Sequence, residues 1–132
     1  MGSSRRSEIH AAVKRYAEAW ATNDLAAAFA CYHDDFILHY FGENPLAGTH
    51  RGKEACLAVL MQVAQKTNRK LVAIRDVLAG DEFGLIVAVE DFFRDGEPIR
   101  IERLLRYTVK DGKLAECWIY DEDQRLIDAI LT

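Results

Sequence analysis

The pattern of apolar residues predicts three helices in the first half of the chain. A helix over residues 8–22 places four of them on one stripe: Ile9, Val13, Tyr16 and Trp20. The polar segment at 22–24 ends this helix and supplies an N-cap for a short Ala-rich helix over 25–32. Residues 53–66 carry a third apolar stripe, which predicts the third helix.

After residue 66 the pattern changes from helices to strands. Apolar and β-branched residues dominate four runs, over 71–78, 83–93, 99–109 and 114–121. The turns at 95–96 and 111–112 are Asp-Gly pairs, which favour hairpins. An earlier strand is expected over 36–41, a loop over 42–52, and a short C-terminal helix over 122–131.

Together these elements predict an α+β fold in a single domain. Successive hairpins give an antiparallel sheet, and three N-terminal helices must cover one face of it to bury their apolar stripes. A chain of 132 residues suits one domain. We assign that domain to residues 8–132, and we expect the polar residues 1–7 to be a disordered leader.

Composition narrows the possible partners. Half of the residues are apolar, 29% are charged, and the formal net charge is −4, with basic residues scattered among acids. A nucleic-acid-binding protein would show a basic stripe instead. No run reaches the ~20 apolar residues that span a bilayer, and the polar N-terminus lacks the apolar core of a signal peptide. We therefore expect a cytoplasmic protein that binds neither nucleic acid nor membrane.

The cysteines and histidines do not suggest a metal site. The three cysteines lack metal-ligand spacing, and their odd number argues against a disulfide framework, so we interpret them as small buried residues. The four histidines have no acidic or Cys partner at ligand spacing, apart from His33 beside the solvated-looking Asp34-Asp35. We expect no metal and no cofactor.

The order and spacing of four segments are more specific than any one motif. They are RYAEAWATNDLAAAFACYHDDF (15–36), NPLAGTHRGKEACLAVL (44–60), YTVKDGKLAECW (107–118) and DEDQRLIDAIL (121–131). With the strand order between them, the chain resembles the SnoaL-like and ketosteroid isomerase-like branch of the nuclear transport factor 2-like superfamily. The resemblance implies a cone-shaped α+β fold, with three N-terminal helices on a curved antiparallel sheet. It also implies an apolar pocket for a small apolar molecule and a homodimer through the sheet.

The resemblance carries over only part of the isomerase site. Tyr16 matches the tyrosine of the isomerases, where a tyrosine and a protonated Asp hold a dienolate. Tyr40 and Leu105 stand where the two isomerase acids are expected, so we do not predict a steroid isomerase of that mechanism. Tyr16 is then either a ligand contact or a core residue whose hydroxyl finds a partner at the rim.

Strand alternation predicts which residues face the pocket. With Trp20 from the first helix, the substrate-binding set is Trp20, Phe36, Tyr40, Phe83, Leu85, Leu105, Tyr107 and Ile119. The opposite face of the last strand carries Glu116, Trp118 and Tyr120, a set suited to a subunit interface. A single bulge would reverse such assignments.

Four residues are the candidates for catalysis: Tyr16, Asp121, Asp91 and Arg103. Asp121 ends the last strand, near the position of an acid/base Asp in the SnoaL-like cyclases that the chain resembles, although it could instead cap the C-terminal helix. Asp91 and Arg103 are plausible neighbours across one hairpin, where they form either a structural ion pair or part of an Asp-Arg-Asp site. The latter would resemble limonene epoxide hydrolases, although their Arg-x-Asp pattern is absent, because Leu105 follows Arg103 two residues later.

Three functions remain open at this point. The first is a cofactor-independent isomerase, cyclase or dehydratase that transfers protons on an apolar carbonyl compound. The second is a non-catalytic ligand-binding protein of the same fold, and the third is a dimerisation module whose pocket is filled by its own side chains. A cavity of some hundreds of Å³ would separate the third from the others.

Overall fold

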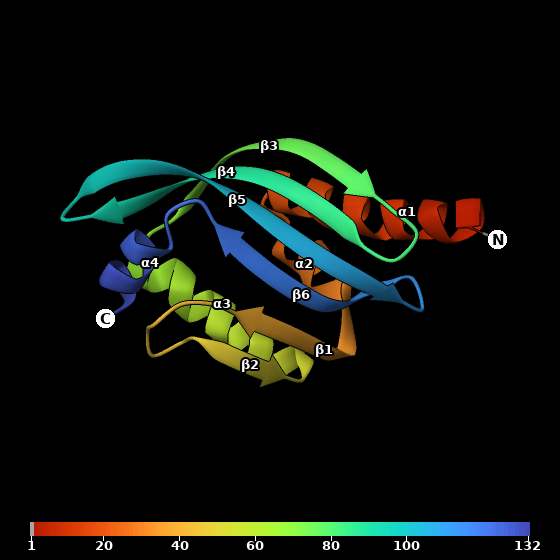
Figure 1. The fold of residues 1–132 in the computed structure, drawn as a ribbon, viewed down its shortest axis with the longest axis horizontal. Coiled ribbons are helices and arrows are strands. Elements are labelled where there is room, and N and C mark those ends of the chain that lie inside the picture. Colours follow the sequence, from red (N-terminus) through yellow and green to blue (C-terminus); the bar gives the residue numbers. More distant parts are fainter. Residues whose placement is uncertain (1) are drawn as a thin grey trace.

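The computed structural model describes residues 2–132. Its helices are α1 (Gly2–Ala21), α2 (Leu25–Ala30), α3 (Lys53–Thr67) and α4 (Gln124–Leu131). Its strands are β1 (Tyr32–Tyr40), β2 (Gly48–Arg51), β3 (Lys70–Ala79), β4 (Gly84–Arg94), β5 (Glu97–Lys110) and β6 (Lys113–Asp121). The predicted α+β class is confirmed: the strands form one curved sheet, and α1 and α2 lie behind it in the view of Figure 1.

The sheet is mixed rather than wholly antiparallel, which corrects the predicted topology. Its strand order is β2-β1-β6-β5-β4-β3, and the hairpins from β3 to β6 are antiparallel as expected. The exception is β1, which pairs with β6 in parallel. No hairpin joins these two strands, so local turn chemistry does not fix their relative direction.

Two boundaries near β1 also differ from the prediction. The first strand begins at Tyr32 rather than at residue 36, so α2 is shorter than expected. The expected loop over 42–52 contains β2, which pairs with β1 from Ile37↔Arg51 to Tyr40↔Gly48. This edge strand has only four residues and no apolar alternation, so the sequence pattern gives no signal for it.

Helix α1 begins at Gly2, within the segment 1–7 that the sequence suggested as a leader. Arg5 Nη2 donates a hydrogen bond of 2.6 Å to the carbonyl oxygen of Val109, and Arg6 Nη2 lies 2.9 Å from Asp81 Oδ1. These contacts attach the extra turns of α1 to the end of β5 and to the β3–β4 turn. Met1 lies outside the described residues.

A glycine allows α1 to pack close to the sheet. A Cβ atom at Gly84 would lie 2.5 Å from Val13 Cγ2 and 3.0 Å from Ile9 Cγ2, both on the apolar stripe of α1. Ile9 and Val13 are fully buried, and they join a core that includes Phe36, Leu38, Ile86 and Phe92. No described helix is long and apolar enough to cross a membrane.

Candidate functional site

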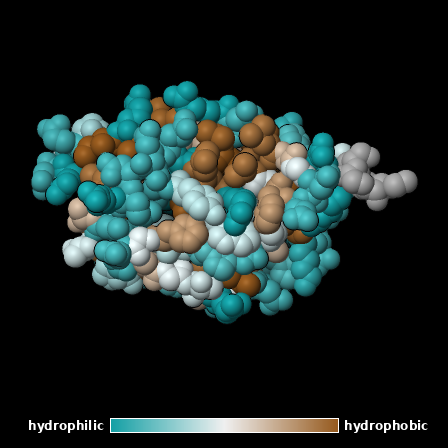
Figure 2. All heavy atoms as spheres, viewed as in Figure 1, coloured by the Kyte–Doolittle hydropathy of each residue, from teal (hydrophilic) through white to brown (hydrophobic). Residues whose placement is uncertain are grey.

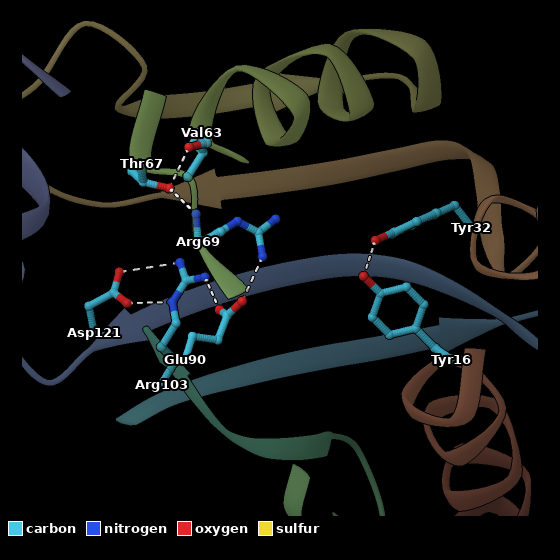
Figure 3. A network of polar contacts seen from close by, with 8 residues as sticks. All are labelled: Tyr16, Tyr32, Val63, Thr67, Arg69, Glu90, Arg103 and Asp121. Carbon is cyan, nitrogen blue, oxygen red and sulfur yellow. Dashed lines mark hydrogen bonds and ion pairs between the residues drawn. The ribbon is translucent and has the colours of Figure 1, made fainter. Parts of the chain in front are cut away.

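A cavity of about 710 Å³ lies between the helices and the inner face of the sheet. Most of its wall is apolar: Trp20, Phe36, Leu38, Leu57, Leu60, Leu105 and Ile119. The polar side chains in the wall include a tyrosine pair and a group of charged side chains, which lie apart from each other in Figure 3. This volume falls in the range of small-molecule sites.

The tyrosine pair consists of Tyr16 from α1 and Tyr32 from β1. Their hydroxyl oxygens are 2.7 Å apart, with the Tyr32 hydroxyl donating to that of Tyr16, and the two rings pack edge to face. Burial raises the pKa of Tyr16 and raises that of Tyr32 well above its ordinary value, so both phenols are neutral at pH 7. Two neutral hydroxyls that share one hydrogen bond keep one O–H free to donate to a ligand.

The ionised group is a chain of four side chains (Figure 3). Arg103 donates from Nη1 to Glu90 Oε2 at 2.7 Å and from Nε to Asp121 Oδ1 at 2.5 Å. Arg69 Nη1 donates to the other oxygen of Glu90, Oε1, at 2.9 Å. The side chains of Glu90, Arg103 and Asp121 are at most 2% exposed, and that of Arg69 is 17% exposed.

The charges in this network balance, because it contains two guanidinium groups and two carboxylates. Burial by itself raises the pKa of Glu90, but Arg103 and Arg69 outweigh burial and hold that pKa below its ordinary value. Glu90 is therefore a carboxylate at neutral pH. The neighbouring Asp121 and Glu90 raise the already high pKa of Arg103 despite its burial.

The β4–β5 hairpin positions Glu90 and Arg103. Asp95 and Gly96 both adopt positive φ, as a two-residue hairpin turn requires, so Arg94 pairs with Glu97. The pairing then continues without a shift along the hairpin, which puts Arg103 opposite Ala88. Glu90 is two residues from Ala88 and shares its face, so both charged groups point inward.

Arg69 is positioned by the end of α3. Thr67 Oγ1 donates to the carbonyl oxygen of Val63 and accepts from the backbone N–H of Arg69 at 3.3 Å. Asn68, the C-cap of α3, is left-handed, with φ 51°. This turn brings the Arg69 side chain to the cavity wall, with Nε buried and without a partner among the described residues. A buried N–H without an acceptor costs about 1–3 kcal/mol.

The structure brings most of the predicted site residues to the cavity. Those that line it are Tyr16, Trp20, Phe36, Arg103, Leu105, Tyr107 and Ile119.

Tyr107 and Cys117 form a hydrogen bond in the wall, and burial raises the pKa of Tyr107 well above its ordinary value and that of Cys117 to about 12. Cys117 is therefore a neutral thiol at physiological pH.

Three predicted residues lie on the opposite face of the sheet: Asp91, Phe83 and Leu85. Asp91 binds Arg100 at the surface, at 3.0 Å, rather than Arg103. Phe83 packs against Trp118 and Arg106, and Leu85 pairs with Arg106. The prediction of an inward face was wrong here, because both faces of β4 are apolar and alternation cannot choose between them. A two-residue Asp-Gly turn pairs Arg94 with Glu97, and continuing this register along the hairpin places Arg103 opposite Ala88 and on the same face as Glu90.

Tyr40 and Asp121 point inward as predicted but do not line the cavity. The Asp121 carboxylate forms an ion pair with Arg103 and does not reach the cavity. The N-cap of α4 is Asp123 rather than Asp121. Tyr40 is 2% exposed, and its hydroxyl has no partner among the described residues. Burial, moderated by the nearby Arg103, raises the pKa of Tyr40 to about 12.

The cavity residues that the sequence did not predict include Glu90, Arg69 and Tyr32, which carry its polar chemistry. The sequence does contain a signal for a functional role of Glu90, because this residue is an acid within a long apolar run that is otherwise typical of a buried strand. Tyr32 was assigned to a helix that in fact ends at Ala30. Arg69 follows a helix C-cap, where nothing in the sequence indicates a direction for its side chain. No group of three metal-ligating side chains occurs in the part of the chain that the structure describes.

Comparison with solved structures finds the same fold in several proteins. A Xanthomonas campestris protein of unknown function with a cystatin-like fold is 24% identical, over 91% of this chain and 95% of that chain, with a TM-score of 0.82. TerC, crystallised with polyporic acid, is 15% identical over 92% of this chain and 96% of its own, with a TM-score of 0.75.

A Mesorhizobium loti protein described as a SnoaL-like polyketide cyclase is 25% identical, over 83% of this chain and 95% of that chain, with a TM-score of 0.68. The sequence matches none of the curated proteins. The family model of the SnoaL-like domain matches residues 13–117, which include the tyrosine pair and the hairpin that carries Glu90 and Arg103. The chain therefore belongs to the SnoaL-like domain family.

Proposed function

We propose that the protein binds a small, largely apolar carbonyl compound in its cavity and transfers a proton at the carbon next to the carbonyl group, without a cofactor. The observation that carries this proposal is the arrangement of the cavity. An apolar wall encloses both a neutral hydroxyl donor and an ionised carboxylate, the two groups that enolisation needs.

The tyrosine pair is the site for the carbonyl oxygen. Its free O–H donates to that oxygen, and the hydrogen bond strengthens as negative charge develops on the oxygen. Because burial raises the pKa of both phenols, neither gives up its proton in the resting protein. A ligand contact is one of the two roles that the sequence left open for Tyr16, and the proposal extends it to Tyr32.

Glu90 takes the role of proton acceptor that the sequence suggested for Asp121. Glu90 lines the cavity, whereas Asp121 lies behind Arg103. A carboxylate oxygen can accept more than one hydrogen bond, so Glu90 keeps lone pairs beyond those engaged by the arginines. Glu90 takes the proton, the C–H electron pair forms a C=C bond, and the carbonyl oxygen becomes an enolate oxygen. Return of the proton to another carbon completes an isomerisation.

The lowered pKa of Glu90 limits the substrates. A carboxylate that the two arginines hold ionised is a weak base, so proton transfer is fastest from carbons that are already acidified. Carbons between two carbonyl groups, or between a carbonyl and a C=C bond, meet this condition. Cyclisation and dehydration of such compounds begin with the same proton removal.

The epoxide-hydrolase alternative has one observation in its favour. Glu90, Arg103 and Asp121 form an acid–arginine–acid arrangement, with Glu90 in place of the expected Asp91. That chemistry needs one acid to donate a proton to the epoxide oxygen, whereas Glu90 is held ionised and Asp121 does not line the cavity. Proton transfer on a carbonyl compound is the better supported function.

Binding can be tested with trans-2-decalone, an apolar ketone that absorbs only weakly where tryptophan is excited. The chain has two tryptophans; Trp20 lines the cavity and Trp118 packs on the other face of the sheet. In a Trp118→Phe background, Trp20 fluorescence therefore reports on the cavity. Saturable quenching by the ketone is expected, and its absence would overturn the binding proposal. Tyr16→Phe should weaken binding about tenfold, the loss of one good hydrogen bond.

Catalysis can be tested with a β,γ-unsaturated analogue of the same ketone, in which one carbon lies between the carbonyl group and the C=C bond, by following hydrogen–deuterium exchange at that carbon in D₂O. Glu90→Gln should lower the enzymatic exchange rate by about two orders of magnitude or more. Asp91→Asn is the matched control, because Asp91 is adjacent on β4 but faces the other side of the sheet. Binding without accelerated exchange would favour the non-catalytic ligand-binding function. Tyr16→Phe provides a second measure if Glu90→Gln does not fold.

A homodimer through the outer face of the sheet remains part of the proposal. Figure 2 shows apolar side chains gathered over this face, where Leu78, Leu104 and Tyr120 are exposed. Arg106 stacks there on the rings of Phe83 and Trp118. Sedimentation equilibrium should give twice the mass of the chain, and Leu104→Glu should return the mass of one chain.

A further inference from the structure

We infer that Arg69 is a second ligand-binding residue, and that the ligand carries a neutral acceptor oxygen at each end of an apolar body. The inference rests on the proposed function, because it assumes that the tyrosine pair holds one oxygen of a ligand in this cavity. It adds the partner for the other end and thereby names the substrate class: an apolar dicarbonyl compound.

The first support is the incomplete hydrogen bonding of Arg69. Its Nη1 donates to Glu90 at 2.9 Å, whereas its Nε is buried and has no partner among the described residues. The residue lines the cavity, and its side chain is 17% exposed. Among the described residues only Glu90 accepts a hydrogen bond from the guanidinium group, which carries five N–H donors. The exposed part of this group at the cavity wall can therefore donate to an oxygen of a ligand.

The second support is the separation of the two donors. The tyrosine pair and Arg69 lie apart in the cavity wall, as Figure 3 shows. Most of the remaining wall is apolar, with Phe36, Leu38 and Leu105 among its residues. A molecule that reaches both donors must have an apolar middle and one acceptor toward each end.

The third support is the charge of the network, which favours a neutral acceptor over a carboxylate. Arg69 and Arg103 are already balanced by Glu90 and Asp121. The other charged residues that line the cavity, Asp24 and Lys70, are exposed and have opposite signs. A ligand carboxylate at Arg69 would add an unbalanced negative charge beside Glu90. A ketone oxygen accepts the same hydrogen bond without that repulsion.

The test compares three compounds with one skeleton: trans-2-decalone, trans-decalin-2,6-dione and trans-decalin-2-carboxylate. Dissociation constants are measured by Trp20 fluorescence in the Trp118→Phe background. The dione should bind about tenfold more tightly than the monoketone, and the carboxylate more weakly than either. In Arg69→Met the preference for the dione over the monoketone should disappear. The ratio of two constants within one variant cancels any general change in the fold.

Two further variants separate hydrogen bonding from charge. Arg69→Lys keeps the cation near Glu90 but lacks the planar fork, so it should lose most of the preference for the dione. Arg100→Met removes an arginine from an acid pair outside the cavity and should keep the preference. If the dione gains nothing over the monoketone, or the carboxylate binds most tightly, the inference about Arg69 is overturned and the proposed function stands. If none of the three compounds binds, both the proposed function and the inference about Arg69 are overturned.

Discussion

Arg103 donates to Glu90 at 2.7 Å and to Asp121 at 2.5 Å while only 2% of its own side chain is exposed. One guanidinium group therefore serves two carboxylates from the neighbouring strands β4 and β6, in the middle of an otherwise apolar core. Removing this guanidinium group would leave two buried carboxylates without their shared partner, and the resulting loss of stability can be measured.

Replacement of Arg103 by methionine should destabilise the protein by about 3–5 kcal/mol, because Glu90 and Asp121 would lose a shared buried partner. Urea unfolding at neutral pH measures the loss. Arg100→Met is the control, since the Arg100–Asp91 pair is mostly exposed on the arginine side, and it should cost at most about 1 kcal/mol. Equal losses in the two variants would contradict a structural role for the buried network.

Acid should destabilise the protein through Glu90. Arg103 and Arg69 outweigh burial and hold its folded pKa below the ordinary value of 4.5, so the folded state binds fewer protons than the unfolded state in that range. The stabilisation is then complete above the ordinary pKa and is lost as pH falls through the lowered folded pKa.

Urea unfolding of the wild type and of Glu90→Gln from about pH 6 to about pH 3 isolates this contribution. The stability advantage of the wild type should shrink toward the acid end, because glutamine does not titrate. An advantage that stays constant over the whole range would show that Glu90 is not held ionised by the two arginines.

Alkaline titration should find four tyrosines with a raised pKa. Burial raises the pKa of Tyr16, Tyr32, Tyr40 and Tyr107. Absorbance at the phenolate band should therefore show these four of the chain's five tyrosines ionising above their ordinary pKa of 10.0, or only as the protein unfolds. In concentrated urea all five should titrate near that ordinary value. If most tyrosines of the folded protein ionise near their ordinary pKa, the packing of these side chains around the cavity is not as described.

Gly84→Ala should test the close packing of α1 on β4. A Cβ atom there would lie 2.5 Å from Val13 Cγ2, so the helix must move away, at a cost of about 1–3 kcal/mol. Gly80→Ala is a matched control, because the nearest atom to its Cβ would be the Phe83 carbonyl oxygen at 3.8 Å. Thermal unfolding of both variants provides the comparison; a smaller loss at Gly84 than at Gly80 would show that α1 is not tightly docked.

Much of the fold could be predicted from local patterns. The stripe of Ile9, Val13, Tyr16 and Trp20 defined one face of α1, and the Asp-Gly turns placed two hairpins. Each signal comes from residues close together in the chain, where helix and turn chemistry act directly. The family resemblance, carried by spacing over nearly the whole chain, is confirmed by the match over residues 13–117.

The sequence by itself determined most of the elements, the class and the family, because periodicity and turn residues act over short distances. Tertiary structure alone decided which charged residues meet. Glu90 rather than Asp91 reaches Arg103 because the β4–β5 register selects one of two equally apolar faces. Arg69 joins them because the left-handed Asn68 turns the chain after α3. The parallel pairing of β1 with β6 is likewise set by packing, since no hairpin turn fixes the relative direction of these two strands. These outcomes depend on contacts between distant segments, which only packing of the whole chain specifies.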